Sequence, residues 1–295
     1  MATLPHIPIA TLRLGEQDFV WGDRTYVMGV VNATPDSFSG DGVLPMIGDV
    51  QQAVDQALRM EDEGADIIDV GGESTRPASI YPDAKPIEAE NEITRVVPVI
   101  EGLIRRLGIP ISIDTRKAAV ADAAFAAGAS LVNDVSMLGD AEMPGMLANS
   151  GVPIIVSHIR QSGDDGDVVE NVLSDLHRSI QELARAGVER SNIIVDPGIG
   201  FAKSGAQSME MLRNIAALRA ELVLPVLIGT SRKSFIGAVT GESVHDRRFG
   251  TAATVALAIQ GGADIVRVHD VREMVSVVKM SDALTRHRRD GVPDA

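Results

Sequence analysis

The chain contains eight short apolar runs, and each leads to a residue that can hydrogen-bond, ionise or bind a metal. The runs occupy residues 27–31, 67–68, 111–113, 131–132, 154–156, 193–195, 225–228 and 265–266. The polar residues at or just beyond their ends are Asn32, Asp69, Asp114, Asn133, Ser157, Asp196, Ser231 and Arg267. Runs this short and apolar are typical of strands buried on both faces, as in a parallel sheet. Eight such strands predict a (β/α)8 TIM barrel whose functional groups meet at the carboxyl ends of the strands.

The segments between the runs have the periodicity of helices. Apolar side chains recur at i, i+3, i+4 and i+7 over residues 50–58, 93–104 and 169–183, which favours helices that cover a sheet. A glycine opens the similar phrases at 64–68, 128–132 and 262–266, where it suits the end of a helix before the next strand. An open doubly wound sheet is the competing fold, but the first run is not followed by a Gly-x-Gly-x-x-Gly turn.

The length of 295 residues favours one large domain, because a barrel of this kind uses about 250 residues. Residues 1–25 are predicted to be an N-terminal extension with a β-hairpin, since polar and apolar positions alternate around two glycine turns. This hairpin could plug the N-terminal end of the barrel. The barrel domain is predicted over residues 26–287, and residues 288–295 form a polar C-terminal tail.

Composition excludes several classes of protein. The net charge of −14 argues against attraction of the whole surface to nucleic acid. The chain has no cysteine, which excludes disulfides and thiol catalysis and fits the cytoplasm. No apolar run approaches the length of a membrane span, and we expect no signal peptide and no membrane partner. Any anionic ligand must therefore be held by a local cluster of positive groups.

Basic side chains follow the last two runs. Arg232 and Lys233 come after the seventh, and Arg267 and His269 come at the end of the eighth. Barrels often bind phosphate with the loops after strands seven and eight, so these four groups predict an anion site. Pairing with local carboxylates is the alternative for each of them.

Acidic and amide side chains end the third, fourth and sixth runs. A flat heterocycle rich in N–H donors would satisfy Asp114, Asn133 and Asp196 in a dry barrel mouth. In the structural alternative, Asp114 and Asp196 pair with Arg116 and Lys233 to hold the loops.

Glycine-rich loops follow the first two runs. The loop of residues 32–42 is long enough to act as a lid, and the loop of residues 71–77 offers Arg76 as a further anion contact. His158 stands alone at a strand end. The histidines show no zinc-binding spacing and no Gly-x-Ser-x-Gly elbow is present, which argues against a zinc hydrolase and a serine hydrolase.

Taken together, these segments resemble the dihydropteroate synthase family of folate biosynthesis. The matching phrases occupy residues 28–39, 69–77, 112–117, 132–135, 196–203, 231–237 and 267–271, in the order that the family has. The resemblance implies the same barrel. It also implies a Mg²⁺-assisted transferase that joins (7,8-dihydropterin-6-yl)methyl diphosphate to 4-aminobenzoate, giving 7,8-dihydropteroate and pyrophosphate.

The resemblance also implies roles for individual residues. The pterin pocket would contain Asp114, Asn133, Asp196 and Lys233, and the pyrophosphate site would contain Asn32, Arg76, Arg267 and His269. The aminobenzoate side would contain Phe38, Thr75, Pro77, Phe201 and Ser234. The catalytic residues would be Asp114, Lys233, Arg267 and His269, and the Mg²⁺ contact would be Asn32.

The resemblance further implies a homodimer that forms through the outer helices. Two alternatives remain open from the sequence alone: a catalytically silent pterin-binding paralogue, and a pterin-dependent methyltransferase. The basic residues after the seventh and eighth runs argue against the methyltransferase, because methyl transfer has no pyrophosphate to hold.

Overall fold

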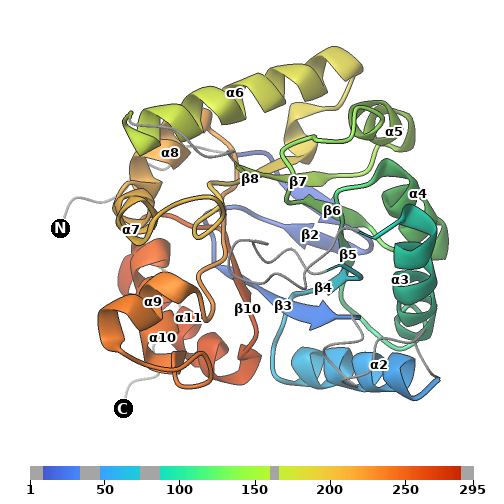
Figure 1. Ribbon diagram of the computed structural model, residues 1–295, viewed down its shortest axis with the longest axis horizontal. Coiled ribbons are helices and arrows are strands. Elements are labelled where there is room, and N and C mark those ends of the chain that lie inside the picture. The colour runs from blue at the N-terminus through green and yellow to red at the C-terminus, as the bar shows by residue number, and fades with distance from the viewer. Residues whose placement is uncertain (1–8, 34–46, 74–86, 160–165, 287–295) are drawn as a thin grey trace.

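The computed structural model describes residues 9–33, 47–73, 87–159 and 166–286 of the chain. Eight parallel strands form a ring that helices surround (Figure 1). The strands are β3 (Tyr26–Asn32), β4 (Ile67–Gly71), β5 (Ile111–Asp114), β6 (Leu131–Asp134), β7 (Ile154–Ser157), β8 (Ile193–Asp196), β9 (Leu227–Ile228) and β10 (Ile265–Val268). Their pairing in the order β8-β7-β6-β5-β4-β3-β10-β9 confirms the predicted (β/α)8 barrel.

The ring closes between β8 and β9. Val195 forms an isolated parallel bridge with Val226, and the Val195 amide donates to the carbonyl of Pro225 at 3.0 Å. The strand at this position is shorter than the apolar run of residues 225–228 because Pro225 has no N–H to donate. The buried carboxylate of Asp264 accepts a hydrogen bond from the Val226 amide at 3.1 Å instead.

Helices connect the strands and cover the outside of the ring. They are α2 (Ile47–Asp62), α3 (Ala89–Leu103), α4 (Ala118–Ala127), α5 (Met143–Ser150), α6 (Val168–Ala186), α7 (Gly205–Arg213), α8 (Ile215–Leu222), α9 (Ser234–Thr240), α10 (Arg248–Gln260) and α11 (Val271–Thr285), with a 3-10 turn η1 (Arg190–Asn192). The apolar faces predicted for residues 50–58, 93–104 and 169–183 pack against the strands as part of α2, α3 and α6, except for Ile104, which follows α3 and is exposed. In the described parts of the chain, no helix is long and apolar enough to cross a membrane.

The predicted glycine junction ends α4. Gly128 has a φ of +119° and its amide bonds to the last carbonyls of the helix, a left-handed conformation that L side chains avoid. A Cβ at this position would also collide with Ile104 at the end of α3. The glycine therefore ends the helix and lets neighbouring helices approach before β6 begins.

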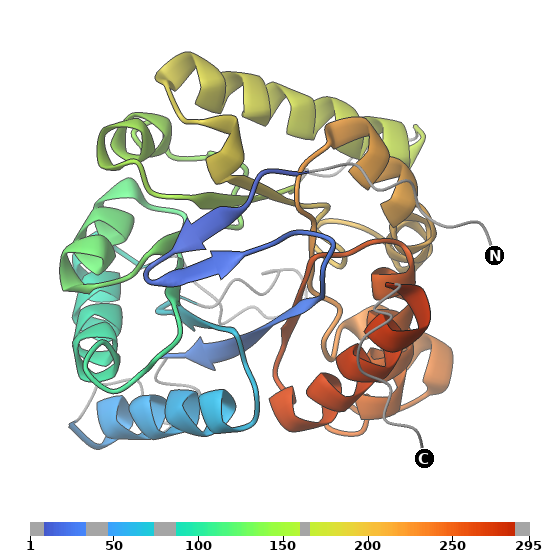
Figure 2. The same ribbon diagram turned by 180° about the vertical axis from the view of Figure 1, so that it is seen from behind.

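The N-terminal hairpin seals one end of the barrel, as the sequence suggested. Strands β1 (Leu12–Leu14) and β2 (Gln17–Phe19) pair antiparallel, and the hairpin lies across the end of the ring that Figure 2 shows. Leu14 and Phe19 belong to a buried cluster with inward-facing residues of seven barrel strands, among them Ile194 and Ile265. Because the hairpin closes this end, a ligand can enter the barrel only at the opposite end, where the carboxyl ends of the strands lie.

Three aromatic rings join the hairpin to the first barrel strand. The ring of Phe19 lies 4.5 Å from that of Tyr26 and 5.9 Å from that of Trp21, centroid to centroid. The Tyr26 hydroxyl accepts a hydrogen bond from the Val20 amide at 2.8 Å. This packing fixes the hairpin on the barrel floor.

We expect Phe19→Ala to lower the free energy of unfolding by about 3–5 kcal/mol, because it leaves a cavity in a closed apolar cluster. Denaturation in urea, followed by circular dichroism, measures the change. Val20→Ala is the matched control, since the adjacent side chain is 46% exposed and its loss should cost about 0.5 kcal/mol or less. Equal effects of the two substitutions would show that the hairpin does not plug the barrel.

Candidate active site at the carboxyl ends of the strands

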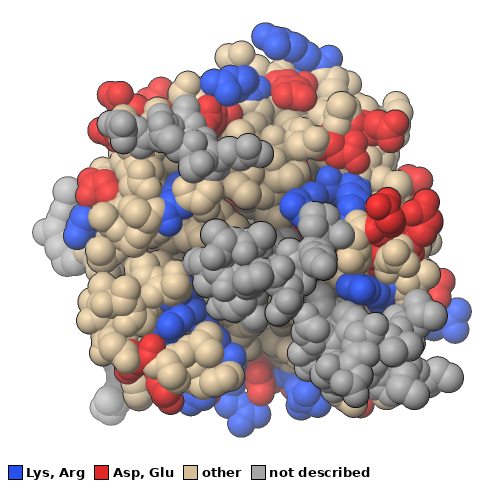
Figure 3. Space-filling view, viewed as in Figure 1, with Lys and Arg blue, Asp and Glu red and all other residues tan. Residues whose placement is uncertain are grey.

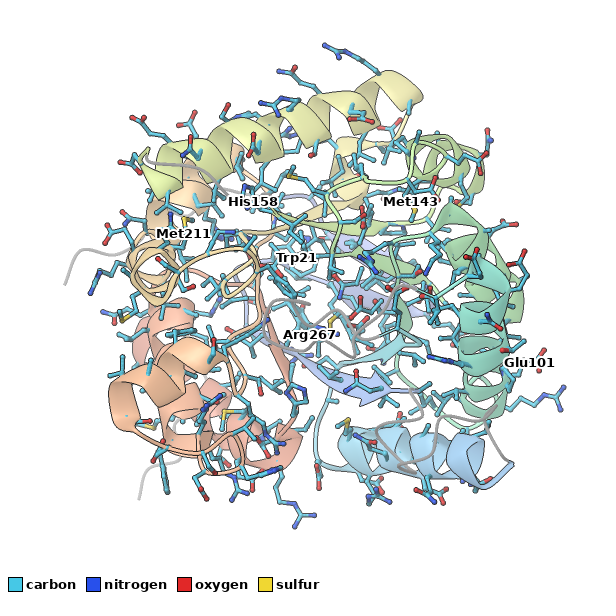
Figure 4. The ribbon with its side chains drawn as sticks, in the orientation of Figure 1. Trp21, Glu101, Met143, His158, Met211 and Arg267 are labelled. Atoms are coloured by element: carbon cyan, nitrogen blue, oxygen red, sulfur yellow. The ribbon has the colours of Figure 1, made fainter. Side chains whose placement is uncertain are left out.

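The polar residues that end the predicted strands gather at the face of the barrel opposite the hairpin. Several Lys and Arg side chains are visible near the centre of this face in Figure 3, whereas the visible Asp and Glu side chains lie mainly toward its edge. Arg267 on β10 lies near the middle of the ring (Figure 4). Exposed basic side chains therefore lie around the barrel mouth in a chain whose net charge is −14.

Arg267 joins two carboxylates inside the barrel mouth. Its Nε donates to Oδ2 of Asp69 at 2.6 Å, and its Nη2 donates to Oδ2 of Asp114 at 2.7 Å. The Asn133 amide also donates to Oδ2 of Asp69, at 2.9 Å. Residues from β4, β5, β6 and β10 therefore share one buried network.

The same network leaves acceptor atoms unused. Oδ1 of Asp69, Oδ1 of Asp114 and Oδ1 of Asn133 are buried and have no hydrogen-bond partner among the described residues. Buried acceptors of this kind are costly unless a donor meets them. Three of them in one barrel mouth fit a ligand whose edge presents several N–H groups.

The pKa of Asp114 is raised to about 7. Burial of the carboxyl group is the largest cause, Arg267 opposes it, and the neighbouring Asp69 adds to it. A nearby cation would stabilise the ionised form of this buried carboxyl group. The barrel mouth is therefore suited to a ligand on which positive charge develops.

Lys233 and Phe201 meet on the neighbouring side of the mouth. The Lys233 ammonium lies 3.7 Å from the centroid of the Phe201 ring, a cation–π contact. Burial and the charge of Arg267 lower the pKa of Lys233 to about 8, while Asp196 opposes the shift. Burial raises the pKa of Asp196, against hydrogen bonding from the Gly198 amide at 2.7 Å.

His269 lies where the two basic loops meet. Its Nδ1 is 3.0 Å from the Ser231 hydroxyl, which also accepts a hydrogen bond from the His269 amide at 3.2 Å. Burial, and then the charges of Arg267 and Arg232, lower the pKa of His269 to about 4. The imidazole is therefore neutral at pH 7 until an anion binds beside it.

Some of the predicted basic groups are already paired. Arg232 forms a two-point ion pair with Asp270, with Nε–Oδ2 at 3.0 Å and Nη2–Oδ1 at 2.5 Å. Its guanidinium therefore serves to join the loops after β9 and β10, as the carboxylate-pairing alternative stated. Arg267 is also paired, yet its Nη1 has no hydrogen bond to a described residue and remains able to donate to a ligand.

The alternative pairing of Asp114 with Arg116 is wrong. Arg116 contacts the buried Glu73 instead, and Lys117 joins Glu73 to Glu92 of α3. Arg116 follows the end of β5 and its guanidinium turns outward to the β4 loop, whereas the Asp114 carboxyl group turns inward to Arg267. The other proposed pairing is replaced by hydrogen bonds from Gly198 and Ser157 to Asp196, with the Lys233 charge nearby.

Two further predicted residues lie at the rim, and the others fall outside the described chain. Asn32 ends β3 and is half-buried, and Ser234 begins α9 and is exposed. Phe38, Thr75, Arg76 and Pro77, with the predicted lid, lie outside the described residues. The described residues contain no group of three His, Cys, Asp or Glu side chains that could hold a metal ion, so Asn32 would need oxygen ligands from elsewhere.

Asp69 is a member of the network to which the sequence assigned no site role. It lies in the middle of β4, where all five residues are buried. A carboxylate in such a strand must have a partner, so its burial is the signal that could have found it.

Comparisons with known proteins agree with this geometry. A family model described as a pterin binding enzyme matches residues 28–269. Fold, site and family model together define a pterin-binding barrel enzyme.

Individual proteins that match most of the chain identify the family more closely. The dihydropteroate synthase of Bacillus subtilis is 44% identical over 263 residues, which cover 89% of each chain. That of Synechocystis is 43% identical and covers 93% of this chain and 95% of its own length. A structure of Xanthomonas albilineans dihydropteroate synthase with 4-aminobenzoic acid has a TM-score of 0.85 at 39% identity, covering 93% of this chain and 97% of that one. The chain belongs to the dihydropteroate synthase family of transferases, which confirms the resemblance of its motifs.

The neutral state of His269 can be tested by titration. We expect its imidazole to remain neutral down to about pH 4 in the ligand-free protein, because its pKa lies well below the ordinary histidine value of 6.5. The unfolded chain takes up this proton at higher pH, so His269 should reduce stability as pH falls from about 6.5 to about 4. Nuclear magnetic resonance of the imidazole measures the pKa. The difference between the parent protein and His269→Gln in free energy of unfolding against pH isolates the contribution of His269. Identical pH dependence in the two proteins would contradict the assignment.

Proposed function

We propose that the chain catalyses the condensation of (7,8-dihydropterin-6-yl)methyl diphosphate with 4-aminobenzoate, releasing 7,8-dihydropteroate and pyrophosphate. The observation that carries this proposal is the set of buried, unused acceptors on Asp69, Asp114 and Asn133. A pterin presents an amino group and ring N–H groups along one edge, and these donors match the acceptors. Family membership supports the same substrate class.

The pterin would lie across the carboxyl ends of β5, β6 and β8. Asp114, Asn133 and Asp196 would accept hydrogen bonds from its polar edge, and the Lys233 ammonium would donate to its carbonyl oxygen. The contact of Lys233 with Phe201 holds the ammonium at this side of the mouth. The N–H donors of the pterin would then face acceptor oxygens of the protein, and its carbonyl oxygen would face a donor.

The pyrophosphate would lie at the ends of β10 and β3. Nη1 of Arg267 can donate to a phosphate oxygen, and an anion beside His269 would raise the pKa of its imidazole and favour the protonated form, in which both ring nitrogens are donors. We propose Arg76 as a further contact from the β4 loop. These groups stabilise the charge that builds on the leaving group as its C–O bond breaks.

We also propose that Mg²⁺ assists this reaction. The amide oxygen of Asn32 at the end of β3 suits a cation that takes few protein ligands and completes its shell with phosphate oxygens and water. When bound, Mg²⁺ would neutralise charge on the pyrophosphate.

Loss of pyrophosphate leaves positive charge that the pterin ring shares. Asp69 and Asp114 together carry more negative charge than Arg267 neutralises when both are ionised. The Asp114 carboxylate would therefore stabilise the pterin cation. Its raised pKa shows that the ionised carboxylate is unfavourable in this buried position until the positive charge forms on the pterin.

The aminobenzoate would approach from the side of Phe201 and Ser234. We propose that Phe38, Thr75 and Pro77 complete this pocket, as in the motifs that they match. The aniline nitrogen has a free electron pair and needs positioning against the pterin methylene carbon rather than activation.

The decisive experiment is a condensation assay. Purified protein, Mg²⁺, the dihydropterin pyrophosphate and 4-aminobenzoate are mixed, and both products are quantified. Equal amounts of dihydropteroate and pyrophosphate, lost on addition of EDTA, support the proposal. Saturable pterin binding without product would instead indicate a silent paralogue, and methyl transfer from a methylated pterin would indicate the methyltransferase.

We expect Asp114→Asn to lower kcat/KM by about a hundredfold or more, because it removes the charge that faces the pterin cation. In the parent protein, kcat/KM should fall as pH drops below about 7, since protonation neutralises this carboxylate. That acid limb should be absent from the profile of the variant. Circular dichroism checks that the variant is folded, and near-normal turnover would remove Asp114 from this role.

We further propose a homodimer in the cytoplasm. Family resemblance supports both statements, and exposed apolar side chains on neighbouring outer helices support the first. Val239, Phe249 and Leu257 on α9 and α10, with Leu284 on α11, are 55–82% exposed, an amount of apolar surface that favours association.

Sedimentation velocity should give the mass of two chains for the parent protein and of one chain for Phe249→Asp, because the charge would be buried against the second copy. Val20→Asp, on the hairpin side, is the control and should remain dimeric. A monomeric parent protein would exclude the dimer.

A further inference from the structure

A second buried network lies behind the pterin site. It includes His158 after β7, Asp175 on the inner face of α6, and Lys203 in the loop between β8 and α7, and Asp175 also pairs with Arg178 at 3.2 Å. His158 and Asp175 are only 2% and 3% exposed. Figure 4 shows His158 beneath α6, away from Arg267 at the centre of the ring.

The contacts fix the protonation of the imidazole. Nδ1 of His158 lies 2.8 Å from the Lys203 ammonium, which has only donors, so this nitrogen must accept. Nε2 therefore carries the hydrogen and donates to Oδ2 of Asp175 at 3.2 Å. A neutral histidine thus links a cation in the site loop to a carboxylate on an outer helix.

Lys203 also holds the backbone of its own loop. Its ammonium donates to the carbonyl oxygens of Gly198 at 3.1 Å and of Phe201 at 3.4 Å. With His158, these acceptors use all three N–H groups of the lysine. The loop of residues 197–203 therefore folds around one half-buried ammonium group.

The loop is held against the end of β7. Gly198 has a φ of +66°, and a Cβ there would collide with the carbonyl oxygen of His158. The Gly198 amide donates to Asp196, and the Phe201 ring lies against the Lys233 ammonium. The two residues whose carbonyls Lys203 binds are thus the ones that orient Asp196 and Lys233.

We propose that Lys203, held by His158 and Asp175, is a positioning residue for the pterin site. It sets the geometry of Asp196 and of the Phe201–Lys233 pair through two backbone carbonyls and does not touch substrate. This inference rests on the proposed function.

The chemistry of the network favours positioning over simple stabilisation. Burying charged groups is costly, and apolar residues of similar volume often stabilise a fold as well or better. Hydrogen bonds from one ammonium to two carbonyls, in contrast, fix the direction of each peptide, which apolar packing cannot do. The network therefore specifies the shape of a loop that carries site residues.

The first test is Lys203→Met, which keeps the length of the side chain and removes its donors. We expect the Kd for the dihydropterin pyrophosphate, measured by calorimetry, to rise about tenfold to a hundredfold, because small displacements of binding groups are costly. The control is Arg185→Met, which removes an exposed cation from the last turn of α6 and should leave this Kd unchanged.

A pair of substitutions at His158 separates positioning from folding. Glutamine supplies an amide oxygen as acceptor and an NH₂ group as donor, so His158→Gln can restore both links, whereas His158→Met has no donor for Asp175 and only a weak sulfur acceptor for Lys203. We expect the Kd of the methionine variant to rise as in Lys203→Met, and that of the glutamine variant to stay within about threefold of the parent value. Thermal unfolding of all variants is recorded alongside.

Unchanged pterin affinity and kcat in Lys203→Met would overturn the inference, even if its melting temperature fell. If Lys203→Met does not fold, the His158 pair decides, and equal Kd values for glutamine and methionine overturn it. Failure of the proposed function gives a different result, because the parent protein would then neither bind the dihydropterin pyrophosphate nor form dihydropteroate.

Discussion

The ion pairs of Arg267 are the interaction on which the rest of the site depends. Its guanidinium meets Asp69 and Asp114, which lie 198 and 153 residues earlier in the chain. These contacts form only when β10 pairs with β3 and brings the two ends of the barrel sequence together. Because an unpaired guanidinium or carboxylate is costly in a dry interior, the pairing of β10 with β3 and the assembly of the site favour each other.

The barrel could be predicted from the sequence because each strand has its own local pattern of apolar and polar residues. An apolar run such as residues 111–113 that stops at Asp114 indicates both a buried strand and the end of that strand at which chemistry can occur. The hairpin could be predicted for the same reason, since alternation around a glycine turn needs no distant information. Residues at strand ends were therefore placed at the correct rim from sequence alone.

Pairing between side chains could not be predicted, because it depends on where each one points across the rim. Arg232 follows β9 and faces Asp270 on the neighbouring loop, whereas Arg267 lies within β10 and faces the barrel interior. Arg232 has a left-handed φ of +57°, which no sequence rule for arginine predicts. His158 seemed isolated because its partners, Asp175 and Lys203, are 17 and 45 residues away.

The seam between β8 and β9 would link the stability of the barrel to occupancy of the proposed pterin site. Val195 and Val226 form a single bridge there, and the chain continues from its two sides to Asp196 and to Lys233. A pterin held by both residues would span the seam and oppose its opening, so occupancy and resistance to unfolding are linked. Chains without pterin would then be the ones most readily opened at this seam and cut by a protease.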